Sequence, residues 1–170
     1  MAKKQPLSLN ALLLRAARDG DFDAVRHYAE EGAALETRDD QGRTALHIAA
    51  ERGYTQSVEI LHEMGADMNA RDRNGETPLH RAARQPLGKE TSALLILLGA
   101  DITLRNRFGE TAFNLVKQEN GLKSVLRGAW LAALQKNPLD VAPELDHDIA
   151  LPPALNIKRR SGPASSPPPA

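Results

Sequence analysis

The sequence predicts an all-α solenoid of stacked helix pairs joined by turn-shaped fingers. Residues 42–50 (Gly-Arg-Thr-Ala-Leu-His-Ile-Ala-Ala) return as residues 75–83 at an offset of 33, and in degraded form as residues 109–116 at an offset of 34. A Gly-Ala pair at residues 32–33 returns twice with the same two offsets. Two markers with one period indicate a repeat architecture. Aromatic residues make up only 4% of the chain, so the core must be built mainly from Ala, Leu, Ile and Val.

The first helix of each central unit is expected to begin at a threonine. Thr44 and Thr77 are natural N-caps, because a hydroxyl oxygen accepts a hydrogen bond from an unsatisfied backbone N–H of the first turn. Pro78 then occupies the first helical position, where its missing N–H costs nothing. Gly53, like Gly20, is expected to end its helix in the left-handed conformation.

The second helix of each central unit carries the larger apolar residues. These are Val58, Ile60 and Leu61 in one unit and Leu94, Leu95, Leu97 and Leu98 in the next. Gly65 and Gly99 end these helices, and polar Gly-ended turns follow at residues 38–42, 71–75 and 105–109. The one-residue insertion lies in the loop at residues 85–88.

Four units are expected, at residues 8–39, 40–72, 73–106 and 107–135, within a domain of residues 8–136. The first unit lacks the Thr-x-x-His element, and either Ser8 or Asn10 begins its first helix. The second helix of the last unit has one apolar stripe at helical spacing: Leu122, Val125, Leu126, Ala129, Trp130, Ala133 and Leu134. Both end units are expected to act as caps, which solenoids require for solubility.

Residues 77–82 (Thr-Pro-Leu-His-Arg-Ala) and 44–49, which lack only the proline, resemble the ankyrin repeat. The resemblance covers residues 8–135. It implies short β-hairpin or turn fingers and histidines, His47 and His80, that hydrogen-bond within and between units. It also places Asn69 at a position that is hydroxylated in some animal ankyrin proteins, although a turn asparagine that bonds backbone is the favoured interpretation.

The composition limits the possible partners. Lys plus Arg balance Asp plus Glu at 22 each, so no global field favours nucleic acid or an anionic membrane. The chain has no cysteine, and no apolar run is long enough to span a bilayer. Lys3 and Lys4 before an apolar stretch loosely resemble a signal peptide, but the register of Leu13 and Ala16 with the repeat favours folded protein here. We expect a cytoplasmic monomer that binds neither a small-molecule substrate nor a membrane.

No catalytic constellation is present in the sequence. The G-x-S-x-G, phosphate-loop and H-E-x-x-H patterns are missing, so we expect no enzyme activity, no cofactor and no metal. His47 and Glu51 stand four residues apart and could share a metal ion in principle. The equivalent repeat positions of His47 and His80 favour a structural role instead.

The resemblance implies that a partner protein contacts the finger tips and the exposed side of the first helices. Mapped by register, this face contains Asp40, Gln41, Arg43, Glu51, Arg52, Arg71, Arg73, Asn74, Glu76, Arg81, Arg84, Arg105, Arg107, Phe108 and Glu110. Eight arginines stand against four acidic residues, and arginine is frequent at interface hot spots. One interpretation is a concave arginine-rich face that receives an acidic protein surface, with Phe108 as an apolar anchor. The other is that these arginines pair with neighbouring acids.

Residues 137–170 contain eight of the eleven prolines and are expected to form a disordered tail. A short proline-rich binding motif is the alternative, and whether Leu145, Ile149 and Leu151 fold back on the last unit stays open. The sequence thus predicts a protein-binding adaptor or inhibitor. A passive scaffold that bridges partners through the tail is a second possibility, while an enzyme or a nucleic-acid binder is remote.

Overall fold

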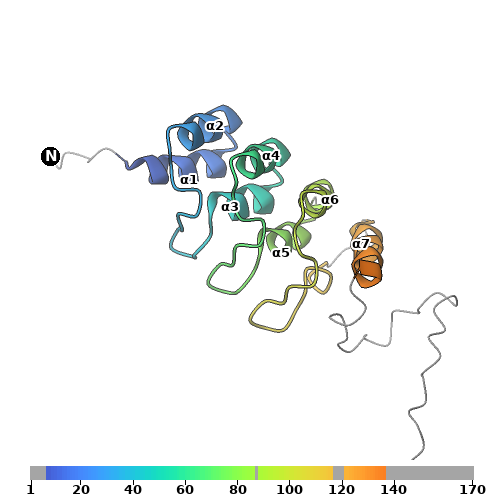
Figure 1. Ribbon diagram of the computed structural model, residues 1–170. Coiled ribbons are helices and arrows are strands. Elements are labelled where there is room, and N and C mark those ends of the chain that lie inside the picture. Colours follow the sequence, from blue (N-terminus) through green and yellow to red (C-terminus); the bar gives the residue numbers. More distant parts are fainter. Residues whose placement is uncertain (1–6, 87, 117–120, 137–170) are drawn as a thin grey trace, which may run out of the picture.

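The computed structural model describes residues 7–86, 88–116 and 121–136. The helices within them are α1 (Leu9–Asp19), α2 (Phe22–Glu30), α3 (Ala45–Arg52), α4 (Thr55–Glu63), α5 (Pro78–Ala83), α6 (Lys89–Leu97) and α7 (Leu122–Lys136). Figure 1 shows α1, α3 and α5 in one row and α2, α4 and α6 in a second row, with α7 at the end. Helices of the same row contact each other, and the two helices of each unit pack together. The predicted all-α solenoid is therefore confirmed.

The helix starts follow the predicted capping. Ser8 caps α1, because its hydroxyl oxygen accepts a hydrogen bond from the Ala11 N–H at 3.3 Å. Asn10 instead joins the helix to the next loop by accepting from the Ala34 N–H at 2.8 Å. The structure therefore decides between the two candidate caps in favour of Ser8. Thr77 caps α5 and is followed by Pro78, as predicted.

The helix ends confirm the predicted glycine caps and explain the insertion. Gly20 and Gly53 are left-handed, with φ of 78° at each. Helix α5 ends differently, because Arg84 at its C-cap keeps a right-handed conformation. Beyond it, the Gly88 N–H donates to the Gln85 carbonyl oxygen at 3.1 Å. Gly88 is required there by close approach, since a Cβ atom on it would lie 1.9 Å from the Ala82 carbonyl oxygen.

The hydrophobic core runs through the whole stack as one cluster. Leu46, Leu61, Leu79 and Leu95 are among its largest fully buried side chains. Leu97, one of the apolar residues of the second helix in the third unit, does not belong to this core, because it is 82% exposed. The repeat register aligns Leu97 with Glu63 of α4, which is also exposed.

The fourth unit lacks a first helix in the described residues. Residues 112–115 form a hydrogen-bonded turn, in which the Asn114 N–H donates to the Thr111 carbonyl oxygen at 3.0 Å. The Asn114 side chain accepts from both the N–H and the hydroxyl of Thr111, at 2.9 and 2.8 Å. In α7 the predicted stripe is buried at Leu126, whereas the side chains of Leu122, Trp130, Ala133 and Leu134 lie outside the described residues.

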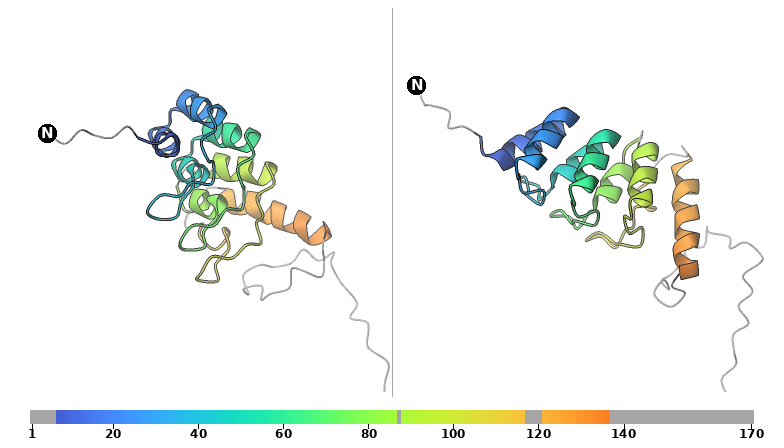
Figure 2. Two further views of the ribbon diagram at one scale, coloured as in Figure 1. Left: turned by 60° about the vertical axis from the view of Figure 1, so that its left-hand side comes forward. Right: turned by 45° about the horizontal axis from the view of Figure 1, so that its top comes forward.

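The fingers at residues 34–44, 67–77 and 101–111 project to one side of the stack in every view (Figures 1 and 2). They are turns, and the described part of the chain contains no strand, so the hairpin form implied by the resemblance is corrected to the turn form. The first finger closes through the Asp39 N–H and the Arg43 carbonyl oxygen, at 2.9 Å, and a single such link does not make a ladder.

Two further predictions concern membrane-spanning helices and the two ends of the chain. None of the helices described here is both long and apolar enough to cross a membrane. The predicted extension at residues 1–7 and the predicted tail at residues 137–170 lie outside the described residues, except for Leu7.

Candidate protein-interaction surface

Each finger is braced by one side chain at the same repeat position. The Asp39 carboxylate accepts hydrogen bonds from the N–H groups of residues 41 and 43, both at 2.9 Å. Asp72 does the same for residues 74 and 76, at 2.7 and 3.0 Å, and Asn106 for residues 108 and 110, at 2.9 and 3.0 Å. The three fingers therefore share one closed turn conformation, and sequence reasoning missed these three residues although their register could have indicated them.

Neighbouring fingers are also linked through their backbones. The Arg73 N–H donates to the Gln41 carbonyl oxygen at 3.1 Å, and the Arg107 N–H donates to the Asn74 carbonyl oxygen at 2.9 Å. The Arg71 guanidinium donates to the Arg105 carbonyl oxygen at 2.8 Å, and Arg105 in turn donates to the Gly109 carbonyl oxygen. Arg71 and Arg105 of the predicted site thus tie the finger stems together.

The finger-tip surface consists of six predicted site residues whose side chains are exposed: Asp40, Gln41, Arg73, Asn74, Arg107 and Phe108. They occupy the same two positions in three consecutive fingers. The Phe108 side chain is 72% exposed, which is unusual for so large an apolar group. The structure therefore presents these six residues side by side on a braced backbone.

Five other predicted residues, in or beside α3 and α5, are instead joined by ion pairs: Arg43, Glu51, Glu76, Arg81 and Arg84. Arg43 pairs with Asp39 at 2.9 Å and with Glu51 at 2.6 Å. Glu51 reaches Arg81 at 3.7 Å, which links one unit to the next. Arg81 also pairs with Asp72 and, at 3.0 Å, with Glu76.

The network ends at Arg84, which pairs with Glu76. The Glu76 side chain is only 2% exposed, so its charge depends on these two arginines. Glu110, one repeat further on, accepts a hydrogen bond from the Asn106 side chain at 3.0 Å. Arg43, Arg81 and Arg84 therefore pair with neighbouring acids, as the second interpretation of the sequence expects.

The network shifts the pKa values of its carboxyl groups. Burial raises the pKa of Asp39, but hydrogen bonds from the Arg43 side chain and from the backbone of residues 41 and 43 outweigh burial and hold it below its usual value. Asp72 behaves in the same way, with burial opposed by Arg81 and by backbone hydrogen bonds. Both groups are therefore stabilised as charged carboxylates.

His47 and His80 are structural, as the resemblance implied. The Thr44 N–H donates to His47 Nδ1 at 3.2 Å, so Nδ1 is the acceptor and Nε2 carries the proton that it donates to the Glu76 carbonyl oxygen at 3.0 Å. His80 makes the same contacts with Thr77 and the Glu110 carbonyl oxygen. Burial lowers the pKa of His47 to about 4.

A metal site at His47 and Glu51 is incompatible with this geometry, because both ring nitrogens of His47 already have protein partners. Within the parts of the chain that are described, no three His, Cys, Asp or Glu side chains form a group that could hold a metal ion.

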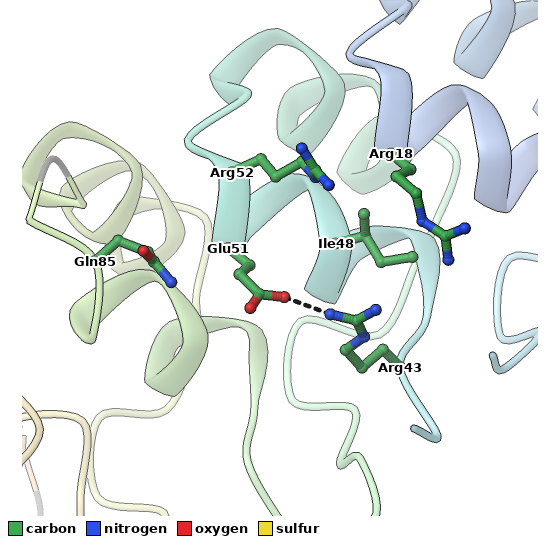
Figure 3. A pocket seen from close by; sticks show the side chains of 6 residues that line it. All are labelled: Arg18, Arg43, Ile48, Glu51, Arg52 and Gln85. Carbon is green, nitrogen blue, oxygen red and sulfur yellow. Dashed lines mark hydrogen bonds and ion pairs between the residues drawn. The ribbon is translucent and has the colours of Figure 1, made fainter. Parts of the chain in front are cut away.

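One hollow of about 240 Å³ lies beside the network (Figure 3). Arg18, Arg43, Ile48, Glu51, Arg52 and Gln85 line it. Three of these residues belong to the predicted site, namely Arg43, Glu51 and Arg52, whereas Arg18, Ile48 and Gln85 were missed. The register contained the signal, because Arg18 aligns with Glu51 and Gln85 aligns with Arg52, one repeat away in each case.

The chain matches a family model described as ankyrin repeats, in three copies, over residues 13–106, which is more than half of its length. It is 42% identical over 60 residues to a putative ankyrin repeat protein of Rickettsia felis, covering 35% of this chain and 95% of that protein. It is also 43% identical over 53 residues to the ankyrin repeat domain-containing protein 46 of Rattus norvegicus, covering 31% of this chain. The match spans only 23% of that longer relative. Ankyrin repeats are in general modules for protein–protein interaction, and this chain belongs to the ankyrin-repeat family.

Proposed function

We propose that the chain binds a partner protein through the finger-tip surface together with the adjoining exposed parts of α3 and α5. One observation carries this proposal: six exposed side chains recur at equivalent positions on three fingers that are braced by Asp39, Asp72 and Asn106. A surface whose backbone is already fixed loses little conformational entropy when a partner binds. The exposed Phe108 is the apolar anchor of the proposed site.

The predicted site residues divide into two roles within this proposal. The residues at the finger tips, and Arg52, contact the partner directly. The paired residues Arg43, Glu51, Glu76, Arg81 and Arg84, and the linking residues Arg71, Arg105 and Glu110, hold the fingers and first helices in position. A partner with an acidic surface is favoured by Arg52, Arg73 and Arg107, whose side chains form no ion pair with an acidic group among the described residues.

The test begins with capture of partners from the source cell's lysate, after which the affinity of an identified partner is measured by calorimetry. The variant Arg73→Glu/Phe108→Ala should weaken binding by at least about tenfold, since it removes one cation and the anchor. Glu59→Arg, an exposed change on α4 in the row opposite the fingers, is the matched control and should leave affinity unchanged. Equal affinity for the wild type and the finger-tip variant would overturn the proposed site.

A truncated chain of residues 1–136 separates the adaptor or inhibitor role from the scaffold role. An adaptor or inhibitor that works through the fingers keeps its affinity without the tail, whereas a tail-dependent scaffold loses its second partner. The inhibitor role, the cytoplasmic location and the monomeric state stay predictions.

A further inference from the structure

The hollow beside α3 contains more cationic than anionic groups. Its lining brings Arg18 from α1 together with Arg43 and Arg52 from the second unit, against a single glutamate, Glu51. In the view of Figure 3 the guanidinium groups of these three arginines are arranged around the Ile48 side chain. We call this hollow the Arg18–Arg52 pocket.

The single acidic group in the pocket is already compensated. Glu51 pairs with Arg43 at 2.6 Å and with Arg81 at 3.7 Å, so it offers little repulsion to an incoming anion. Arg43 in turn donates to both Asp39 and Glu51. Arg43 and Glu51 therefore line the pocket as groups whose charges are already paired.

The guanidinium N–H groups of Arg18 and Arg52 make no hydrogen bond to any described residue. Arg18 approaches Asp39 only at 3.8 Å, which is too long for a hydrogen bond, and Asp39 already accepts from Arg43. The Arg52 side chain makes no hydrogen bond or ion pair with any residue in the described ranges, and it is exposed. Two guanidinium groups that lie in one pocket without good acceptors favour a planar carboxylate, which the guanidinium fork can bind through two parallel hydrogen bonds.

The pocket has room for a side chain. Its volume of about 240 Å³ compares with ~30 Å³ for the share of one water molecule in the liquid. The aliphatic Ile48 side chain among the guanidinium groups suits the methylene groups of a glutamate. The polar Gln85 side chain, from the third unit, also lines the pocket, and Figure 3 shows it on the far side of Glu51 from Arg18.

From this geometry we infer that the Arg18–Arg52 pocket receives a carboxylate side chain, from a Glu or Asp of the partner protein. The inference rests on the proposed function, because it names the partner's chemical group for one part of the same face. A nucleic-acid phosphate chain fits less well, because Asp19, Asp39 and Asp40 lie near the pocket or the adjoining finger and interrupt any continuous basic stripe.

The test is an NMR titration of the arginine side-chain Nε–H signals in the full chain with the peptide N-acetyl-Gly-Glu-Gly-amide, at constant ionic strength. The Arg18 and Arg52 signals should shift together and saturate, with a dissociation constant in the millimolar range. The glutamine version of the peptide should cause no saturable shift. A response that does not saturate, or an equal response to the glutamine peptide, would overturn the inference.

A variant and two further probes sharpen the result. Arg52→Gln should lower the affinity for the peptide by about three- to fivefold, as expected for a partly exposed ion pair. It should also reduce the shift of the Arg18 signal. Arg26→Gln, which alters an exposed arginine paired with Glu63, is the matched control and should have no effect. Tighter saturation of the same two signals by inorganic phosphate or by an oligo-dT strand would overturn the choice of a carboxylate.

The pocket inference and the proposed function can be overturned independently of each other. If Arg73→Glu/Phe108→Ala abolishes capture of a partner while Arg18→Gln/Arg52→Gln leaves its affinity unchanged, only the pocket inference falls. If the finger-tip variant has no effect and the peptide still saturates the pocket, the pocket stands and the proposed finger-tip site falls.

Discussion

Arginines of two kinds stand on the same face of this molecule. Arg43 and Arg81 are partly buried and Arg84 is exposed, and all three pair with acids of the first helices and finger bases. Arg52, Arg73 and Arg107 form no ion pair with an acidic group among the described residues. The chemistry of the side chains is identical. Their environment differs, because the acids at positions 39, 51, 72 and 76 reach only the first group. In the proposed site, the first group therefore holds the surface in shape, and the second group is available for a partner.

The largest expected effect is on folding stability, from Arg81→Ala. This change leaves Asp72 and Glu76 without a main counter-charge, although both side chains are almost fully buried. We expect the free energy of unfolding to fall by about 3–5 kcal/mol, measured by urea denaturation. The matched change Arg73→Ala, at an exposed position, should alter it by less than ~0.5 kcal/mol. Equal effects of the two changes would contradict the division into two kinds.

Lowering the pH should reduce the folding stability of the chain through protonation of His47. Its pKa is about 4 in the folded chain and 6.5 at its ordinary value, so the unfolded chain binds the proton first as the pH falls. Stability is therefore fully present above pH 6.5 and is lost between pH 6.5 and about 4, by about 3 kcal/mol from this group. The lowered pKa of His80 acts in the same direction.

Urea denaturation at several pH values checks this expectation. The lowered pKa values of Asp39 and Asp72 add their loss only when the pH falls below their ordinary value of 3.8, so the two contributions occupy separate windows. The variant His47→Gln should reduce the slope between pH 6.5 and 4. An unchanged slope in that variant would assign the acid sensitivity to other groups.

A smaller loss of stability is expected from Arg43→Gln. Arg43 contacts Asp39 and Glu51, but both acids retain some access to solvent, so the cost should be about 1–2 kcal/mol in thermal or urea unfolding. Arg52→Gln, in the same unit, should cost less than ~0.5 kcal/mol. A cost at position 52 that matches the cost at position 43 would show that Arg52 has a structural role.

The smallest effect on folding should come from Arg73→Glu/Arg107→Glu, which changes two finger tips. Stability should stay within ~0.5 kcal/mol of the wild type, because both side chains are exposed and their backbone links to Gln41 and Asn74 are kept. Binding to an acidic partner should fall by at least about tenfold. The reversal Arg84→Glu is less informative, because it would place a second acid against the buried Glu76 and disturb folding as well as binding.

Much of the fold could be predicted, because the residues that define each repeat act over short stretches of the sequence. Thr77 and Pro78 at a helix start and glycines at helix ends act within one or two turns of backbone, so they identify the elements without tertiary information. The exposure of Leu97 could not be predicted in the same way. Its hydrophobicity suits a core position, and its exposure is established only by the packing of the second helices.

The sequence by itself determined the period, the helix pairs and the fingers, because capping, turn formation and helical spacing are properties of short segments. It also placed the finger tips at the surface, since they follow from the register of the turns. Only the tertiary structure decided which arginines are paired. The Glu51–Arg81 pair joins different units, and the Arg18–Arg52 pocket is assembled from three of them. Charge compensation depends on distances between stacked units, and those distances exist only after the units have packed together.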